Sequence, residues 1–289
     1  MSQIKLFTEG WADYELIDAG GGKKLERWGK IITIRPEVQA YFKSEIPFDK
    51  WNEMAHWEFV QKGNKGSWKA LKKNVPSSWE ISYNRLKFNI SITQFKHVGL
   101  FPEQKINWQF IEKHVKPDDR FLNLFAYTGA ASLVARNVGA ETLHVDSVKQ
   151  LISWAKSNME LSRLLNIKWV AEDALKFAVR EVKRGNKYKG IIMDPPAWGI
   201  GAKGEKWKLE EKIDDLLATA VNLVESGGFL IVNTYSPQLT LEQLRELSEL
   251  YFSDYSVELK ELWMKTTTGK DLYYGNLLRV HFNNQEEED

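Results

Sequence analysis

The sequence predicts an α/β protein in which a small β-rich domain precedes a parallel, nucleotide-binding sheet. From residue 121 onward, short apolar runs alternate with helical patterns, and such alternation is typical of a parallel sheet. Residues 121–146 begin this pattern with an apolar run, a turn at Gly129, a small-residue helix and a second apolar run that ends on Asp146. This order of strand, turn, helix and strand is the first half of a nucleotide-binding unit.

The same periodicity places the remaining elements of the sheet. We expect its strands at residues 121–125, 142–146, 168–171, 190–193 and 228–233. Helices are expected at 130–138, 148–165, 174–183, 208–224 and 241–251. Residues 256–264 and 275–282 follow closely enough to pair as antiparallel strands. The sequence therefore predicts five βα units that end in a C-terminal antiparallel hairpin.

The chain is long enough for about two domains of roughly 150 residues each. Residues 1–95 read as short β segments separated by turns, and we expect them to form a β-rich domain that recognises the substrate. Residues 96–118 are expected to be a linker and a helix, and residues 119–283 the second domain. The acidic tail, 284–289, is expected to be frayed.

The composition excludes several kinds of chemistry. The sequence has no cysteine, which rules out disulfides, thiolate metal sites and any cysteine nucleophile. No run reaches 18 apolar residues and the N-terminus has no signal-peptide core, so we expect a cytoplasmic protein with no membrane partner. The net charge of +1 does not indicate a nucleic-acid binder, so any RNA contact must come from a local patch.

One candidate patch is a basic segment of the first domain. Its lysines would hold RNA phosphates, although a run of charge is also typical of an ordinary solvated surface. The five lysines are Lys62, Lys65, Lys69, Lys72 and Lys73. Seven of the twelve tryptophans precede residue 110, and they either fill the core of a small domain or offer stacking platforms for bases.

Acidic residues at the predicted strand ends indicate a cofactor site, because doubly wound sheets bind ligands there. Asp146 falls seventeen residues after Gly129, close to the spacing at which a carboxylate meets a ribose diol. Only one glycine of the dinucleotide fingerprint is present, which favours a cofactor without a pyrophosphate, S-adenosylmethionine. Asp173 is placed to accept the adenine amine. Either acid could instead cap the helix that follows it. The expected cofactor-binding residues are Asn123, Phe125, Tyr127, Thr128, Gly129, Asp146, Ser147, Asp173, Ala174 and Asp194.

The fourth strand ends in the most specific motif, DPPAW. Two consecutive prolines lack N–H donors and fix the backbone, so the Asp194 carboxylate and nearby carbonyls are expected to accept hydrogens from a nitrogen. Trp198 offers a face on which a flipped base can stack. We therefore expect Asp194, Pro195, Pro196 and Trp198 to be catalytic. The glycine- and lysine-rich loop 199–208 either closes over this site and touches phosphates or is an ordinary surface loop.

Taken together, these motifs resemble class I S-adenosylmethionine-dependent methyltransferases. The similar stretches are FLNLFAYTGAAS, HVDSVKQLISWAKSNMEL, AEDALKF, GIIMDPPAWG and GGFLIVNTYSP. They are most similar to the bacterial large-subunit ribosomal RNA methyltransferase group, which includes cytosine-C5 and guanine-N7 enzymes. The resemblance covers residues 97–240 and implies a Rossmann-like, seven-stranded methyltransferase sheet that holds S-adenosyl-L-methionine. It places the cofactor near Tyr127, Gly129, Asp146, Asp173 and Asp194.

The sequence also departs from this group. HVGLFPEQK resembles the G-x-F-x-D-Q-R element of the group, with Glu103 and Lys105 in the Asp and Arg places. Cytosine-C5 enzymes need a cysteine in the strand-five motif, which here reads Thr234, Tyr235 and Ser236, so that chemistry is excluded. The first domain does not resemble the PUA RNA-binding module of the group.

These observations predict an enzyme that methylates a base nitrogen of ribosomal RNA, with the RNA or a ribosomal subunit precursor as its partner. Two alternatives stay open at this point. One is an N-methyltransferase acting on a protein side chain or a small amine. The other is a catalytically inactive RNA-binding or assembly protein that keeps the fold.

Overall fold

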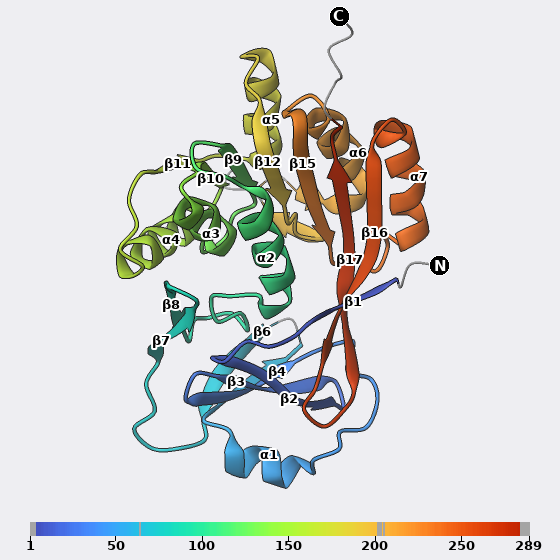
Figure 1. The fold of residues 1–289 in the computed structure, drawn as a ribbon. Coiled ribbons are helices and arrows are strands. Elements are labelled where there is room, and N and C mark those ends of the chain that lie inside the picture. The colour runs from blue at the N-terminus through green and yellow to red at the C-terminus, as the bar shows by residue number, and fades with distance from the viewer. Residues whose placement is uncertain (1–3, 64, 201–203, 205, 284–289) are drawn as a thin grey trace, which may run out of the picture. The chain divides into compact units, whose positions relative to one another are not determined.

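The computed structural model describes residues 4–63, 65–200, 204 and 206–283, and Figure 1 shows the fold. The chain divides into two compact units, each built from segments that are distant in sequence. The large unit contains Met1–Leu6, Ile106–Glu261 and Gly275–Asp289. The small unit contains Phe7–Lys105 together with Leu262–Tyr274. Both chain ends therefore contribute to both units. The expected fraying of the tail at 284–289 lies outside the described residues.

An eight-stranded sheet, ordered β1-β16-β17-β15-β12-β9-β10-β11, is the framework of the large unit. Strands β9, β10, β11, β12 and β15 run parallel, and β17 pairs antiparallel with β15. The predicted α/β fold with a C-terminal antiparallel hairpin is thus confirmed. The strands are β1 (Lys5–Thr8), β9 (Arg120–Leu124), β10 (Glu141–Asp146), β11 (Ile167–Ala171), β12 (Tyr188–Met193), β15 (Val224–Thr234), β16 (Ser256–Lys265) and β17 (Asp271–His281).

Helices cover both faces of this sheet, because strand residues alternate between the faces. One face packs its leucines, valines and isoleucines against apolar residues of α5, α6 and α7 in a continuous core. The opposite face meets α2 and α3, where Phe110 contacts Phe229 and Ser132 contacts Asn123. The helices are α2 (Lys105–His114), α3 (Ala130–Val138), α4 (Lys149–Leu161), α5 (Ala174–Lys183), α6 (Leu209–Ala220) and α7 (Leu241–Phe252).

Local sequence signals predicted the ends of some helices correctly but not those of others. Helices α3 and α5 have the predicted bounds; α3 ends at Gly139, whose φ of 115° suits a helix terminus, and α5 is capped by Asp173. The predicted extension of the helix at 148–165 is wrong, because α4 ends at Leu161 and Arg163 then adopts a positive φ of 56°. The predicted helix 208–224 is also too long, since strand β15 already begins at Val224.

Two strand pairings had no counterpart in the prediction. Strand β1 joins the edge of the large sheet beside β16. A short hairpin, β13 (Trp198–Ile200) and β14 (Lys206–Lys208), follows strand β12. Within the described residues, no helix has the length and apolar character needed to cross a membrane.

The small unit is β-rich. A five-stranded sheet has the order β2-β3-β4-β5-β6, and β7 pairs with β8 in a separate hairpin. The elements are β2 (Tyr14–Gly20), β3 (Lys23–Trp28), β4 (Ile31–Pro36), α1 (Phe48–Met54), β5 (Trp57–Lys62), β6 (Lys65–Ala70), β7 (Ser78–Tyr83), β8 (Leu86–Ser91) and the 3-10 helix η1 (Pro102–Gln104). Buried aromatics such as Trp28 and Trp51 fill its core. The indole N–H groups of four other tryptophans, Trp11, Trp57, Trp68 and Trp79, bond to backbone carbonyls.

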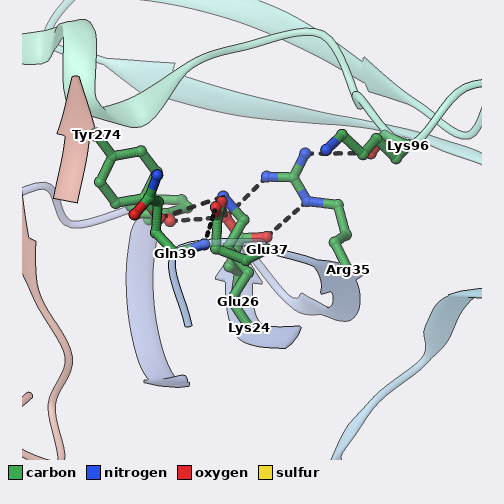
Figure 2. A network of polar contacts seen from close by, with 8 residues as sticks. Lys24, Glu26, Arg35, Glu37, Gln39, Lys96 and Tyr274 are labelled. Atoms are coloured by element: carbon green, nitrogen blue, oxygen red, sulfur yellow. Dashed lines mark hydrogen bonds and ion pairs between the residues drawn. The ribbon is translucent and has the colours of Figure 1, made fainter. Parts of the chain in front are cut away.

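A network of buried charges crosses the small unit (Figure 2). Arg35 donates from Nε and Nη2 to the two carboxylate oxygens of Glu26, at 2.6 and 2.8 Å. Lys24 lies 3.2 Å from Glu37 and donates to the Tyr274 hydroxyl, also at 3.2 Å. Burial alone would raise the pKa of Glu26, but Arg35 and Lys24 lower it to about 2. The carboxylate is therefore held in its ionised form inside the protein.

Candidate active site

Strand register brings the predicted site residues to one edge of the large sheet. Leu124 pairs with Val145 on one side and with Met193 on the other, and Met193 pairs with Val232. These four residues lie at the carboxyl ends of their strands, where open α/β sheets bind ligands. The residues that emerge there are Phe125, Asp146, Asp194 and Asn233.

The turn after β9 has an unusual backbone. Phe125 and Tyr127 both adopt positive φ angles, 57° and 51°, and Gly129 follows at 90°. Non-glycine residues in this region carry a conformational cost, and such residues cluster at functional sites where the surroundings hold them. The turn is therefore a place where the fold stabilises a shape that the local sequence does not favour.

Asp146 holds one side of this turn. Its Oδ2 accepts the backbone N–H of Tyr127 at 2.9 Å, and its Oδ1 accepts that of Val148 at 2.8 Å. Burial raises the pKa of Asp146, and these backbone bonds act in the opposite direction. A carboxylate has about four lone-pair positions in all, so Asp146 can accept a further hydrogen beyond these backbone bonds. Asp146 thus combines a structural bond with spare capacity for a ligand hydroxyl.

Asn158 and the start of α3 hold the other side of the turn. The buried Asn158 side chain donates from Nδ2 to the carbonyl of Thr128 at 3.0 Å. A Cβ atom on Gly129 would lie 3.0 Å from Cβ of Ala155 and 3.2 Å from Cδ1 of Leu133. The glycine is therefore required by its φ and by close packing against α4, and not only by approach of a ligand as the sequence suggested.

Asn123 is directed into the protein. Its Nδ2 donates to Ser132 at 2.9 Å, and the Ser132 hydroxyl contacts Nδ1 of His144 at 3.0 Å. Burial lowers the pKa of His144 to about 3, so this imidazole is neutral. The chain of three side chains fastens α3 to strands β9 and β10, behind the turn.

Asp173 and its neighbours occupy the end of β11. Asp173 is the N-cap of α5, and its Oδ1 accepts the backbone N–H of Lys176 at 2.9 Å. The capping alternative considered for this residue is therefore the contact present in the structure, and it uses only one of the two carboxylate oxygens. Ala174 is buried at the first position of α5, whereas Ser147 is exposed beside Asp146.

The Asp-Pro-Pro-Ala segment after β12 differs from the expectation in one respect. The Pro196 carbonyl accepts the indole N–H of Trp207 at 2.7 Å, and the Ala197 carbonyl accepts the backbone N–H of Leu209 at 3.0 Å. Competing donors thus exist for two of the expected acceptors. No donor among the described residues contacts the carbonyl of Pro195. Trp198 is 60% exposed, as a stacking platform requires.

Trp207 was not predicted as a site residue, because it was expected in a loop, where no periodic pattern distinguishes one residue from another. Its ring lies 5.1 Å from Phe125, so it touches the turn after β9 as well as the segment after β12. Glu210 was missed too; its carboxylate accepts the hydroxyl of Ser236, which follows strand β15. Residues 201–203 and 205 of the expected closing loop lie outside the described residues, and its described ends form the β13–β14 hairpin.

The donors and acceptors at this edge suit S-adenosylmethionine. Asp146 offers acceptor positions for the two ribose hydroxyls, and the turn at residues 125–129 offers a close-packed backbone surface beside it. Asp173 offers one carboxylate oxygen at the next strand end. A cofactor without a pyrophosphate needs no further glycines here.

A doubly wound sheet with acids at successive strand ends is typical of α/β proteins that bind a nucleotide-containing cofactor. The chain matches the model of the S-adenosylmethionine-dependent methyltransferase family over residues 63–259, and it belongs to that family. The crystal structure of an S-adenosylmethionine-dependent methyltransferase from Agrobacterium tumefaciens is 33% identical, with a TM-score of 0.90. That alignment covers 97% of this chain and 94% of the other.

Curated relatives are ribosomal RNA methyltransferases. Ribosomal RNA large subunit methyltransferase I of Aeromonas salmonicida is 26% identical over 246 residues, which is 82% of this chain and 59% of that protein. Ribosomal RNA large subunit methyltransferase K/L of Pseudoalteromonas atlantica is 29% identical over 167 residues, 57% of this chain and 23% of that protein. The chain thus spans less than two thirds of the length of these relatives.

Proposed function

We propose that this protein uses S-adenosylmethionine to methylate a base nitrogen of ribosomal RNA, as the free RNA or within a ribosomal subunit precursor. Family membership supports the cofactor, and the similarity to ribosomal RNA large subunit methyltransferases supports the substrate class. The site supports the type of acceptor atom. It presents oxygen acceptors and an exposed indole at the carboxyl edge of the sheet.

We infer that the methyl acceptor is a nitrogen from the hydrogen bonds of the backbone carbonyls after β12. Trp207 and Leu209 engage the carbonyls of Pro196 and Ala197, which leaves that of Pro195 for the substrate. Proline nitrogens bear no hydrogen, so the segment offers little hydrogen-bond donation to compete with an incoming N–H. A nitrogen that bears hydrogens can donate to Asp194 and Pro195 together.

In this proposal the bound cofactor supplies an electrophilic methyl group, and the protein supplies orientation. Asp194 and the Pro195 carbonyl direct the nitrogen lone pair, while Trp198 stacks on the ring and Pro196 keeps the segment rigid. The attacking nitrogen then loses a proton, and we assign the Asp194 carboxylate as its acceptor. Positioning of this kind is worth effective molarities of about 10⁵–10⁸ M. The sequence has no cysteine, so no cysteine adduct at a pyrimidine C6 forms.

For the cofactor, we assign Asp146 to the ribose hydroxyls and Asp173 to the adenine amine. Phe125, Tyr127, Thr128 and Gly129 would line it through their backbone, with Ser147 and Ala174 at the flanks. Asn123 supports the turn from behind. Residues 1–95 are proposed to recognise the substrate, with the exposed lysines Lys65, Lys69, Lys72 and Lys73 as phosphate contacts.

The decisive experiment is transfer of labelled methyl from S-adenosylmethionine into unmodified large-subunit ribosomal RNA, tested as naked RNA and as assembled subunits. Label that is lost on nuclease digestion supports the proposal, and nucleoside analysis then names the methylated atom. Label that survives nuclease and follows protein or a small amine moves the function to that substrate. Failure to bind the cofactor, measured by calorimetry, would identify an inactive protein that keeps the fold.

A further inference from the structure

The β13–β14 hairpin has two faces of different character. Trp198 pairs with Lys208, and Gly199 pairs with Trp207. Because side chains alternate along a strand, Trp207 lies on one face, whereas Trp198, Lys206 and Lys208 lie on the other.

Trp207 fastens the first face to the protein. Its indole N–H bonds to the Pro196 carbonyl, and its ring packs against Phe125. The hairpin is therefore held against the two strand ends that form the candidate site. The second face points away from this attachment, and among its described residues Lys208 pairs with Glu211.

The second face is exposed and basic. Trp198 is 60% exposed, and both Lys206 and Lys208 are exposed. The two lysines stand two residues apart on one strand, about 7 Å, which is comparable to the separation of neighbouring phosphates along a nucleic-acid strand.

Among the described residues, the acids beside this face are Glu210 and Glu211; both are engaged, and no described acid pairs with Lys206. Glu211 contacts Lys208 at 2.8 Å, with both side chains more than half exposed. Such surface pairs contribute little, so a phosphate can replace Glu211. Glu210 is bonded to Ser236.

We propose that this face binds a single-stranded RNA segment, with one base stacked on Trp198 and adjacent phosphates on Lys206 and Lys208. An exposed indole flanked by two cations matches a polyanion with planar bases. A duplex does not fit, because its bases stack on one another and not on a protein ring. The inference rests on the proposed function and specifies how its substrate strand is held.

The test is fluorescence anisotropy of the full-length protein with a labelled single-stranded RNA oligonucleotide over a series of salt concentrations. Trp198→Ala should weaken binding by about 5- to 150-fold, the range measured for one base–aromatic stack. The double variant Lys206→Ala/Lys208→Ala should lower the slope of log affinity against log salt by about 1.4, or roughly 0.7 for each phosphate on a single strand.

The matched control is Lys168→Ala, because Lys168 is also an exposed lysine with an acidic partner, Glu141, but lies on the edge strand β11. It should leave affinity and salt slope unchanged. A blunt RNA duplex of the same sequence should bind more weakly and should not respond to Trp198→Ala. Binding of S-adenosylhomocysteine by calorimetry verifies that each variant is folded.

Normal RNA binding and normal salt slope in the Trp198 and lysine variants would overturn the inference, as would an equal loss in the Lys168 control. If RNA still receives the methyl label in that case, methylation of RNA stands, whereas the hairpin assignment fails together with the stacking role proposed for Trp198. If the label enters a ribosomal protein in a manner that depends on Trp198, this face binds protein, and both proposals fail.

Discussion

Lys24 donates a hydrogen bond from Nζ to the hydroxyl of Tyr274 at 3.2 Å, which joins residues 250 positions apart (Figure 2). Lys24 belongs to strand β3, and Tyr274 to strand β17, at the other end of the chain. The same ammonium also lies 3.2 Å from Glu37 and 3.6 Å from Glu26. The small unit thus includes a C-terminal segment, Leu262–Tyr274, that follows most of the large unit in the sequence.

Replacement of Lys24 by methionine should destabilise the protein strongly, because it removes a buried cation and leaves Glu37, whose side chain is 15% exposed, without this partner. Loss of one partner of a buried ion pair costs about 3–5 kcal/mol. The neighbouring Lys23→Met is the matched control: Lys23 pairs with Glu58, but its side chain is 43% exposed. We expect a cost of less than about 1 kcal/mol there. Urea unfolding measures both, and equal losses would contradict a special role for the buried network.

This relationship also shows what the sequence reveals and what it does not. Helices α3 and α5 were predicted with their bounds, because a glycine at 139 and an acid at 173 are local signals. The joining of Lys24 to Tyr274 and of β1 to β16 has no local signal, since long-range pairing depends on the whole fold. These two contacts join distant segments, whereas the helix ends at Leu161 and Ala220 and the β13–β14 hairpin are local features that the sequence pattern also missed.

The candidate site also has features that the sequence predicted and features that it did not. The positions of Asp146, Asp173 and Asp194 at strand ends followed from periodicity, because parallel strands bring their carboxyl ends to one edge. The use of the Pro196 carbonyl by Trp207 did not follow, since eleven residues and a hairpin separate them. Periodicity locates a site, whereas the contacts within it depend on the conformation of its loops.

Asp194→Ala should reduce methyl transfer by at least about 100-fold, the lower range for loss of a positioned acid or base. The reason is that Asp194 directs the acceptor nitrogen and takes up its proton. Circular dichroism and the melting temperature should remain near those of the wild type. The control is Asp215→Ala, an exposed acid on α6. Turnover in Asp194→Ala within a few-fold of the wild type would refute this role.

Trp207→Phe should lower turnover with the RNA substrate without weakening cofactor binding. The ring contact with Phe125 is retained, but the Pro196 carbonyl loses its indole donor. We expect turnover with RNA to fall about tenfold, in line with the loss of one hydrogen bond to a constrained carbonyl. Affinity for S-adenosylhomocysteine should change little. Kinetics and calorimetry on the same preparations measure the two effects, and Trp169→Phe on strand β11 is the control.

Asn158→Asp should make cofactor binding depend on pH. The wild-type amide donates to the Thr128 carbonyl, and an ionised aspartate cannot. At pH 8, we expect affinity for S-adenosylhomocysteine to fall by about tenfold, the range for loss of one buried hydrogen bond. At pH 5, the buried carboxyl is protonated and can donate again, so affinity should recover.

Asn158→Leu, which has no donor at any pH, should show the same loss without the recovery. Asn222→Asp serves as the matched control, because the Asn222 amide bonds to the Ala218 carbonyl, at the C-terminal end of α6. Calorimetric titrations with S-adenosylhomocysteine at pH 5 and pH 8 measure the affinity of each variant. A loss in Asn158→Asp that does not change with pH would show that the amide acts by packing alone.

Glu103 provides a pH-dependent prediction for stability. Burial raises the pKa of Glu103 to about 7, while the nearby cations Lys24 and Arg35 lower it and Glu37 raises it. In the unfolded chain the carboxyl has a pKa of about 4.3. The folded state therefore binds the proton more tightly, and its contribution to stability is complete below about pH 4 and is lost as the pH rises through 7.

Glu103→Gln removes this dependence, because a neutral amide resembles the protonated acid. At pH 8 the variant should be more stable than the wild type by on the order of 3 kcal/mol, and at pH 4 the two should be equal. Glu26→Gln should behave in the opposite way at pH 8, since Arg35 and Lys24 hold the pKa of Glu26 at about 2 and the variant loses an ionised partner. Urea unfolding at both pH values tests the pair. A destabilised Glu103→Gln at pH 8 would mean that this carboxylate is ionised and paired in the folded protein.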